Sequence, residues 1–293
     1  MDFTVVVPTY ERPVELAACL AALAALDWPR ERYEVVVVDD GGTRDLASAL
    51  AGVADRLPVR LLVQRNRGPG AARNAGAALA GGRWLAFTDD DCRPRAGWLR
   101  GLAAALAGAP DVLAGGRTFN RLTDNAFAEA SQFIADAAYA NFNRDRSRAR
   151  FLASNNMAVA RAGFVASGGF DERFRVASED RDFCARWLHA GHRIVWTDGA
   201  EVDHGHALTL VGFLRQHYRY GRGAARYHRM RVARGSGTLW DELAWRWPWL
   251  ELLLRPALAS AHPARALALL VCWQAANAAG FAREALLPDS PRG

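Results

Sequence analysis

Short apolar runs alternate with helical patterns through the first half of the chain. The apolar runs are predicted strands, at 3–7, 34–38, 59–63 and 83–88. Leucine and alanine recur at helical spacing between them, which predicts helices at 13–26, 43–54 and 68–79. Pro8 is expected to end the first strand. Because strands alternate with helices, we predict βαβ units and a mostly parallel α/β sheet.

The second half of the chain continues this alternation with more polar connections. Further helices are predicted at 96–107, 124–139 and 178–190. Further strands are predicted at 112–117, 193–197 and 200–203. The segment 141–150 is polar and rich in arginine, so we expect a mobile surface loop there.

Carboxylates follow two of the predicted strands directly. Asp89-Asp90-Asp91 ends the fourth strand, and Asp39-Asp40 ends the second. The carboxyl ends of parallel strands lie on one rim of a sheet, where open α/β sheets bind ligands. Adjacent carboxylates repel one another unless a cation compensates them, and hard divalent ions prefer oxygen ligands. The sequence therefore predicts a divalent metal site at this rim.

Both acidic clusters also allow an interpretation without a ligand. A solvated acidic turn is the alternative for Asp89-Asp90-Asp91, and helix capping is the alternative for Asp39-Asp40. An EF-hand is excluded, because the twelfth position of such a loop would be Arg100 and not a glutamate.

Basic charge is concentrated in one segment. The 293 residues carry a net charge of +6, all 37 basic residues are arginine, and seven of these lie between His204 and Trp240 without any acidic residue. The remainder is close to neutral, which indicates a specific anionic partner and argues against nucleic acid.

The four cysteines are far apart, so neither a disulfide framework nor a zinc cluster is expected. No signal peptide is recognisable, which predicts a cytoplasmic location.

Six motifs occur in an order that is typical of one enzyme family. They are Val5-Val6-Val7-Pro8-Thr9-Tyr10, Val38-Asp39-Asp40-Gly41, Gly70-Ala71-Ala72-Arg73-Asn74-Ala75-Gly76, Thr88-Asp89-Asp90-Asp91, Ser154-Asn155-Asn156 and Ser178-Glu179-Asp180. By these motifs the chain resembles the family-2 glycosyltransferases with the GT-A fold. This Rossmann-like fold implies a mixed, mostly parallel sheet flanked by helices.

The resemblance also implies a domain organisation. It predicts a catalytic domain at 1–205, with a nucleotide-sugar-binding half at 1–118 and an acceptor-binding half at 119–205. A basic and amphipathic helical region would follow at 206–293.

Several residues of these motifs would bind the donor. The resemblance implies a nucleotide pocket lined by Pro8, Thr9, Glu11, Asp39 and Arg73. Asp89 and Asp91 would form the D-x-D pair, with Asp91 as the more direct ligand of Mn²⁺ or Mg²⁺. Such an ion neutralises the diphosphate that leaves when the glycosidic bond breaks.

The acceptor side is implied in the same way. Asp180 would be the catalytic base, Glu179 its neighbour in the acceptor site, and Asn156 a substrate-binding residue. An inverting transfer needs a base that takes the proton of the attacking hydroxyl. Without the family context, Glu179 and Asp180 are interpreted as first-turn acids that favour a helix dipole.

Histidines and arginines near the end of the domain are further candidates. His204 and His206 lie on one face at a predicted strand end, so His204 is a candidate metal ligand, with a surface histidine as the alternative. Gln216 and Arg219 are candidate substrate contacts. With Tyr220 they are similar to the Q-x-x-R-W motif of processive members, and the tyrosine in place of tryptophan leaves processivity open.

Five arginines have the spacing of one helical stripe, namely Arg215, Arg219, Arg222, Arg226 and Arg229. They are candidate contacts for phosphate or anionic lipid, and a solvated basic face is the alternative. Gly221 and Gly223 would weaken a continuous helix there and open the option of a break.

The C-terminal region is rich in tryptophan, leucine and alanine. Its longest charge-free run, Ala266–Ala282, has 17 residues, at the short edge of the ~17–25 that span a bilayer. An interfacial helix or a packed helical hairpin is therefore favoured over a membrane span. This leaves open a peripheral contact with the inner face of the cell membrane.

These observations predict a metal-dependent glycosyltransferase. It would move a hexose-type sugar from a UDP-, GDP- or dTDP-sugar to a hydroxyl of a glycan or lipid-linked acceptor in cell-envelope or polysaccharide synthesis. One alternative is a sugar-phosphate nucleotidyltransferase, suggested by Gly41-Gly42-Thr43-Arg44. The absence of lysine and the position of that loop after the second strand argue against it. The other alternative is a non-catalytic, membrane-docked binding protein of the same fold.

Overall fold

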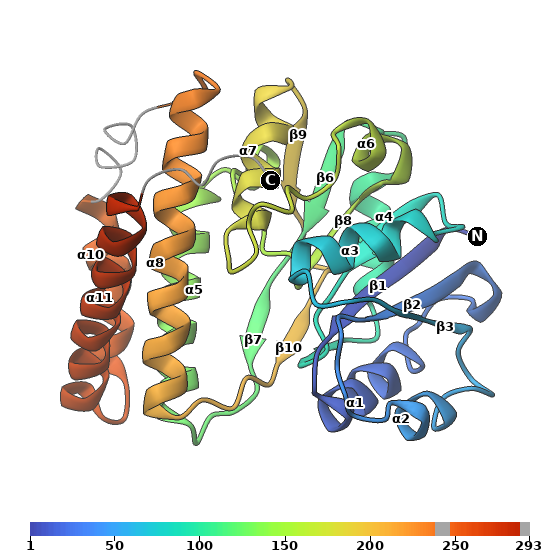
Figure 1. Ribbon diagram of the computed structural model, residues 1–293, viewed down its shortest axis with the longest axis horizontal. Coiled ribbons are helices and arrows are strands. Elements are labelled where there is room, and N and C mark those ends of the chain that lie inside the picture. Colours follow the sequence, from blue (N-terminus) through green and yellow to red (C-terminus); the bar gives the residue numbers. More distant parts are fainter. Residues whose placement is uncertain (238–246, 288–293) are drawn as a thin grey trace. The chain divides into compact units, whose positions relative to one another are not determined.

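The computed structural model describes residues 1–237 and 247–287, which form two compact units (Figure 1). The first unit comprises Met1–Arg121, Asn143–Arg175 and Asp180–His206. The second comprises Leu122–Phe142, Val176–Glu179 and the described residues from Ala207 onward. Each unit has hydrophobic clusters of its own.

A seven-stranded sheet is the centre of the first unit. Its strands are β1 (Phe3–Thr9), β2 (Tyr33–Asp39), β3 (Val59–Val63), β4 (Trp84–Phe87), β6 (Val112–Gly115), β8 (Met157–Ala160) and β9 (Arg193–Trp196). Their order is β3-β2-β1-β4-β8-β6-β9. Only β8 runs antiparallel to its neighbours among these strands. The predicted mixed, mostly parallel α/β sheet is therefore confirmed.

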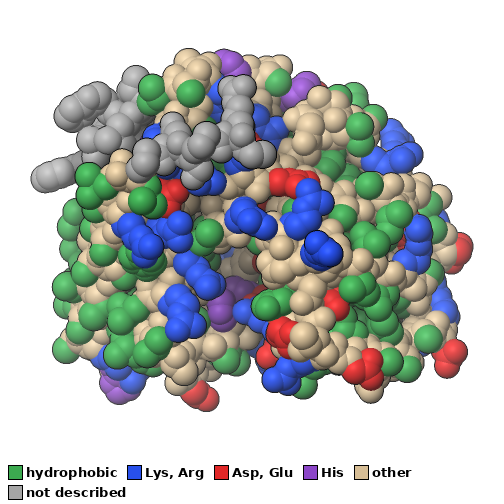
Figure 2. Space-filling view, in the orientation of Figure 1, with side chains coloured by type: hydrophobic (Ala, Val, Ile, Leu, Met, Phe, Trp, Pro, Cys, Tyr) green, Lys and Arg blue, Asp and Glu red, His purple; other side chains and the backbone are tan. Residues whose placement is uncertain are grey.

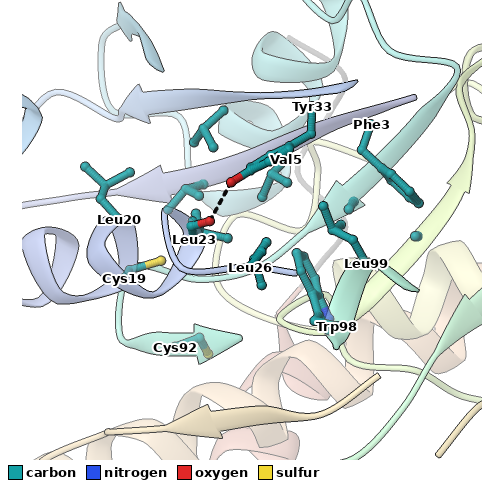
Figure 3. Packing of buried hydrophobic residues seen from close by; sticks show 14 of the residues in the cluster. Phe3, Val5, Cys19, Leu20, Leu23, Leu26, Tyr33, Cys92, Trp98 and Leu99 are labelled. Atoms are coloured by element: carbon teal, nitrogen blue, oxygen red, sulfur yellow. Dashed lines mark hydrogen bonds between the residues drawn. The ribbon is translucent and has the colours of Figure 1, made fainter. Parts of the chain in front are cut away.

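Helices cover both faces of this sheet because the strand side chains alternate between two cores. Val5 and Val7 face the core that is closed by α1 (Pro13–Leu23), α2 (Ala47–Ala51) and α4 (Trp98–Leu106). Val6 faces the core that is closed by α3 (Pro69–Ala78), α6 (Arg161–Ala166) and α7 (Glu179–His189). Figure 3 shows the first core, where the Tyr33 hydroxyl donates to the Leu23 carbonyl at 2.8 Å.

A small second sheet extends the same unit. It contains β5 (Cys92–Pro94), β10 (Val202–His204) and β7 (Thr118–Asn120), in that order. β10 pairs antiparallel with β5, so that His204 lies opposite Cys92. This pairing brings a residue from late in the chain next to the acidic cluster that follows β4.

The first strand is longer than predicted, because Pro8 does not end it. β1 continues to Thr9, and Pro8 lies opposite Val38 of β2. The Val6 carbonyl accepts from the Thr88 N–H on the β4 side, and the Thr9 carbonyl accepts from the Asp40 N–H on the β2 side. Because alternate residues of a strand face the same neighbour, the backbone nitrogen of Pro8 faces β4. The pairing with β4 ends at Val6. The missing N–H of proline therefore removes no ladder hydrogen bond.

One other prediction differs from the structure, because the helix predicted at 43–54 forms only over α2, five residues long. The predicted loop at 141–150 lies at the surface, with residues 144–148 exposed. The buried Asn143 anchors it and accepts from the backbone N–H groups of Arg150 and Phe151.

The second unit is helical. It contains α5 (Ala126–Phe142), α8 (Leu210–Ala233), α10 (Trp247–Ala259) and α11 (Pro263–Leu286). α8 is continuous through Gly221 and Gly223, so the proposed break is absent. Gly221 of α8 and Gly280 of α11 let the two backbones approach closely, because a Cβ on either would lie 2.0 Å from a carbonyl oxygen of the other helix. In the described residues, no helix is long and apolar enough to cross a membrane.

Three arginines of the predicted stripe hold α8 against α11. Arg222, Arg226 and Arg229 lie 2.9, 3.3 and 3.6 Å from carboxylate oxygens of the buried Glu284. These three therefore have a structural partner within the unit. Arg215 and Arg219 are exposed.

We predict that Gly221→Ala destabilises the protein. The added Cβ would meet the Asn277 carbonyl at 2.0 Å, and a backbone atom cannot rotate away. Overpacking of this kind costs about 1–3 kcal/mol, which should lower the melting temperature by several degrees in a thermal unfolding experiment.

Gly52→Ala is the matched control. Its Cβ would meet no atom closer than 3.5 Å, and its φ of −61° suits alanine. Its melting temperature should be unchanged or slightly higher. Equal stability of the two variants would contradict the close helix approach.

Candidate functional site

Polar side chains of the first unit converge where the central strands end. Thr9 ends β1, Asp39 ends β2, and Asp89, Asp90 and Asp91 follow β4 directly. All three strands are parallel, so these residues lie on one rim. The rim predicted from the sequence is therefore present.

Asp90 and Asp91 belong to one hydrogen-bonded cluster. The Thr9 hydroxyl donates to Asp90 Oδ2 at 2.8 Å. Arg12 Nη1 lies 3.2 Å from Asp90 Oδ1 and 2.9 Å from Asp91 Oδ2. The other oxygen of Asp91, Oδ1, lies 3.2 Å from His204 Nε2. Asp90 thus braces the loop, whereas Asp91 faces the histidine.

The acids of this cluster differ in their ionisation. Burial raises the pKa of Asp90 to about 7, against the opposing effect of Arg12. Burial would also raise the pKa of Asp91, but His204 and Arg12 outweigh it and hold that pKa below its usual range. Burial lowers the pKa of His204, and Asp91 more than compensates, so that its pKa is raised. Asp91 is therefore the carboxylate kept ionised.

The donor atoms at Asp91 fit a divalent ion. Ligand atoms of Asp91, Cys92 and His204 lie within 4.8 Å of one another. Burial raises the pKa of the Cys92 thiol well above its usual value, and a soft sulfur ligand suits Mn²⁺ or Mg²⁺ less well than oxygen does. A carboxylate oxygen and an imidazole nitrogen remain, a donor set that suits Mn²⁺. Asp91 and His204 could hold such an ion, with Asp89 beside them.

Arg73 connects the acidic cluster with α3. Its buried guanidinium forms an ion pair with Asp89 and lies 5.8 Å over the Phe170 ring. α3 begins at Gly68-Pro69, where Gly68 adopts a positive φ of 91°. A Cβ at Gly68 would lie 2.9 Å from the Arg175 carbonyl, so only glycine fits this turn.

Asp40 holds the same turn from the other side. Its carboxylate accepts from the backbone N–H groups of Arg67 and Gly68 at 2.9 and 2.8 Å, and from Gln64 Nε2 at 2.7 Å. Asp40 therefore fixes the start of α3, and through it the position of Arg73.

Asp39 and Glu11 lie together around the loop that follows β2. Asp39 Oδ1 accepts from the Gly42 N–H at 2.8 Å. Glu11 Oε1 accepts from the Thr43 N–H at 2.6 Å, and Glu11 has a positive φ of 60°. Left-handed backbone at a residue other than glycine costs about 1–3 kcal/mol and is concentrated at functional sites. Asp39 and Glu11 therefore both hold the backbone of this loop, at Gly42 and Thr43.

Asp180 is partly buried at the start of α7. It accepts from the Arg181 N–H at 2.7 Å and from the Ser154 N–H at 3.3 Å. Burial raises its pKa, while the Arg181 hydrogen bond and the charge of Arg73 oppose the rise. Asp89 also acts on it electrostatically. Asp180 and the acidic cluster therefore share one electrostatic environment.

Other predicted residues have different surroundings. Asn156 is 1% exposed, accepts from Trp98 Nε1, and donates to the carbonyls of Arg117 and Ala200. Its side chain is thus engaged in the packing of the unit. Glu179 is buried at the first position of α7. Gln216 and Arg219 lie on α8 of the second unit.

Two residues of this network were not predicted to act at the site. Arg12 was missed because an arginine directly before a predicted helix resembles an ordinary helix-start residue, although its place next to Glu11 was a signal. Asp40 was grouped with Asp39, and sequence could not show that its oxygens point to the Gly68 turn.

Comparisons with known proteins bear on this site. Residues 4–166 match the model of the family named Glycosyl transferase family 2. Glycosyltransferase AglE of Haloferax volcanii is 34% identical over 116 residues, which are 39% of this chain and 38% of that protein. The pre-mycofactocin glycosyltransferase of Mycobacterium tuberculosis is 29% identical over 235 residues, 76% and 47% of the two chains. The chain thus spans less than half the length of these relatives.

Solved structures share the fold. The mannosyltransferase PcManGT of Pyrobaculum calidifontis, in complex with GDP-Man and Mn²⁺, has a TM-score of 0.66 at 20% identity, over 97% of this chain and 87% of that one. TarS 1-349 of S. aureus has a TM-score of 0.58 at 19% identity, over 97% and 90%. With the family match over more than half of its length, the chain belongs to glycosyl transferase family 2 and has the GT-A fold.

Proposed function

We propose that this protein is an inverting, metal-dependent glycosyltransferase that uses a nucleoside-diphosphate sugar. The observation that carries the proposal is that an imidazole nitrogen of His204 lies 3.2 Å from a carboxylate oxygen of Asp91, while Asp180 lies within the electrostatic reach of Arg73 and Asp89. Similar proteins support it, since one solved structure is named as a complex with GDP-Man and Mn²⁺ and another with UDP-GlcNAc.

Each residue has a defined part in the proposed reaction. The Asp180 carboxylate takes the proton of the acceptor hydroxyl while that oxygen attacks the anomeric carbon. Thr9, Glu11, Asp39 and Arg73 hold the nucleotide, with Pro8 shaping the pocket. A divalent ion at Asp91 and His204, beside Asp89, supplies charge neutralisation for the leaving diphosphate.

The domain assignment follows from these roles. Residues 1–118 would bind the donor and 119–205 the acceptor, with Glu179 beside the attacking hydroxyl. Gln216 and Arg219 would contact substrate from the helical region at 206–293. The structural role of Asn156 makes direct substrate contact through its amide the weakest of these assignments. The acceptor is proposed to be a glycan or a lipid-linked sugar, and no nucleic acid is involved.

We predict that Asp91→Ala and Asp180→Asn both abolish transfer but differ in donor binding. UDP-, GDP- and dTDP-sugars should first be screened by thermal shift with and without Mn²⁺, and the stabilising donor then used in a transfer assay. Asp180→Asn should lower kcat by about 10²–10⁴-fold and keep the metal-dependent shift. Asp91→Ala should lose that shift as well.

The outcome separates the alternatives. Full turnover by Asp180→Asn would remove it as the base. Release of pyrophosphate from a nucleoside triphosphate would indicate a nucleotidyltransferase instead. Absence of any donor-dependent shift would favour a non-catalytic binding protein.

We predict an acid limb in the pH dependence of kcat/KM. Burial raises the pKa of Asp180 above its ordinary value, and the base must be deprotonated to act. Activity should therefore be lost as the pH falls through this raised pKa, at higher pH than for an exposed aspartate. Rates measured from pH 4 to 9 test this, and the residual rate of Asp180→Asn should lack the limb. A wild-type profile that is flat down to pH 4 would contradict it.

We also propose that the second unit makes a peripheral contact with the inner face of the cell membrane. A shallow groove of about 530 Å³ is lined by Val211, Leu214, Arg215, Tyr218, Cys272, Ala275 and Ala276. Val211 and the nearby helix position Val271 are 62% and 70% exposed. Arginine side chains gather along α8 on the face in Figure 2. Exposed apolar groups beside cations suit an anionic lipid surface.

We predict that Val211→Glu weakens binding to vesicles. A carboxylate there opposes both insertion into lipid and attraction to anionic headgroups. Co-sedimentation with phosphatidylglycerol vesicles should fall several-fold, and phosphatidylcholine vesicles should bind the wild type poorly. Val165→Glu is the matched control, because Val165 is 67% exposed but lies in the first unit. Equal binding by both variants would contradict this membrane contact.

A further inference from the structure

Arg12 occupies an unusual position in the acidic cluster. One nitrogen, Nη1, bridges Asp90 Oδ1 at 3.2 Å and Asp91 Oδ2 at 2.9 Å. The two carboxylates are 6% and 7% exposed, whereas the Arg12 side chain is 42% exposed. The guanidinium therefore reaches from solvent onto buried acids, and it can leave without opening the core.

Arg12 supplies positive charge to two of three consecutive acids. Arg73 forms an ion pair with Asp89, His204 faces one oxygen of Asp91, and Arg12 faces both Asp90 and Asp91. Burial lowers the pKa of Arg12, but Asp91 and Asp90 outweigh this and raise it, so the guanidinium stays charged.

Arg12 also stands beside the position at which a metal ion would meet Asp91. One oxygen of Asp91 faces Arg12 and the other faces His204. A divalent ion held by Asp91 and His204 would therefore lie within a few ångströms of the guanidinium. Two cations at such a distance repel each other strongly in a partly buried site.

A nucleoside diphosphate removes this conflict. It brings anionic oxygens to the same rim, and an arginine fork pairs well with phosphate. The half-exposed side chain at the N-cap position of α1 has the freedom to turn from Asp91 to such a group.

We propose that Arg12 is the resident counter-cation of the metal site. In the donor-free protein it competes with the divalent ion for Asp91, and when the donor binds it turns to the diphosphate. Metal and nucleotide then bind cooperatively, because each relieves the cost that Arg12 imposes on the other. This inference rests on the proposed function. It makes Arg12 a positioning residue that couples the binding of the two ligands.

The test is Mn²⁺ binding to the donor-free protein, measured by calorimetry or by the electron paramagnetic resonance of free Mn²⁺. Arg12→Gln keeps side-chain length and polarity but removes the charge, and should bind Mn²⁺ about 10-fold more tightly than the wild type. Arg12→Lys keeps the charge and should stay near the wild type. With UDP or GDP added, the gain in Mn²⁺ affinity should be smaller in Arg12→Gln than in the wild type.

Arg32→Gln is the matched control for the loss of one positive charge. Arg32 pairs with Asp2 at the amino end of β1, whereas the site lies at its carboxyl end, roughly 20 Å away at ~3.3 Å per residue. It should bind Mn²⁺ like the wild type, and melting temperatures verify that all variants are folded.

Unchanged or weaker Mn²⁺ affinity in folded Arg12→Gln would overturn the proposal. An equal gain in Mn²⁺ affinity on adding UDP or GDP in Arg12→Gln and in the wild type would also overturn it. The readout here is metal binding and needs no sugar transfer. Failure of the Arg12 proposal would therefore appear in Mn²⁺ affinity. Failure of the transferase assignment would appear instead as a lack of donor-dependent stabilisation and of turnover.

Discussion

The compensation of three consecutive carboxylates at the end of a buried strand is the constraint on which the site depends. Asp90 and Asp91 share Arg12, and each of Asp89, Asp90 and Asp91 also has a partner of its own from a different part of the chain. Arg73 comes from α3, Thr9 from β1 and His204 from β10. Because buried charges are stable only when they are paired, this one cluster fixes the ends of several elements relative to each other.

The glycine turn before α3 transmits this constraint to the rest of the rim. Asp40 binds the backbone of Gly68, which sets the helix start and hence the direction of Arg73. Arg73 in turn acts on both Asp89 and Asp180. Arg73 therefore links Asp89, with which it forms an ion pair, to Asp180, on which its charge acts.

In the helical unit, close approach of backbones has the same organising role. Gly221 and Gly280 bring α8 and α11 together, and the arginines that face α11 converge on the buried Glu284. Arg215 lies instead beside an apolar groove. The evenly spaced arginines of α8 thus have different surroundings. Those near Glu284 form ion pairs, and Arg215, farther along the helix, does not face it.

The sequence by itself determined the alternating fold, the strands at the centre of the sheet and the acidic rim, because period and chain order are local properties. It also indicated His204, Arg73 and Asp180 as candidates. Tertiary structure alone decided the partner of each group. Arg12 pairs with Asp90 and Asp91, and Asp40 accepts from the backbone of the Gly68 turn. Asn156 accepts from Trp98 inside the first unit. It also kept Pro8 inside β1. Hydrogen-bond and ion-pair partners lie far apart in sequence, so spacing carries no record of them.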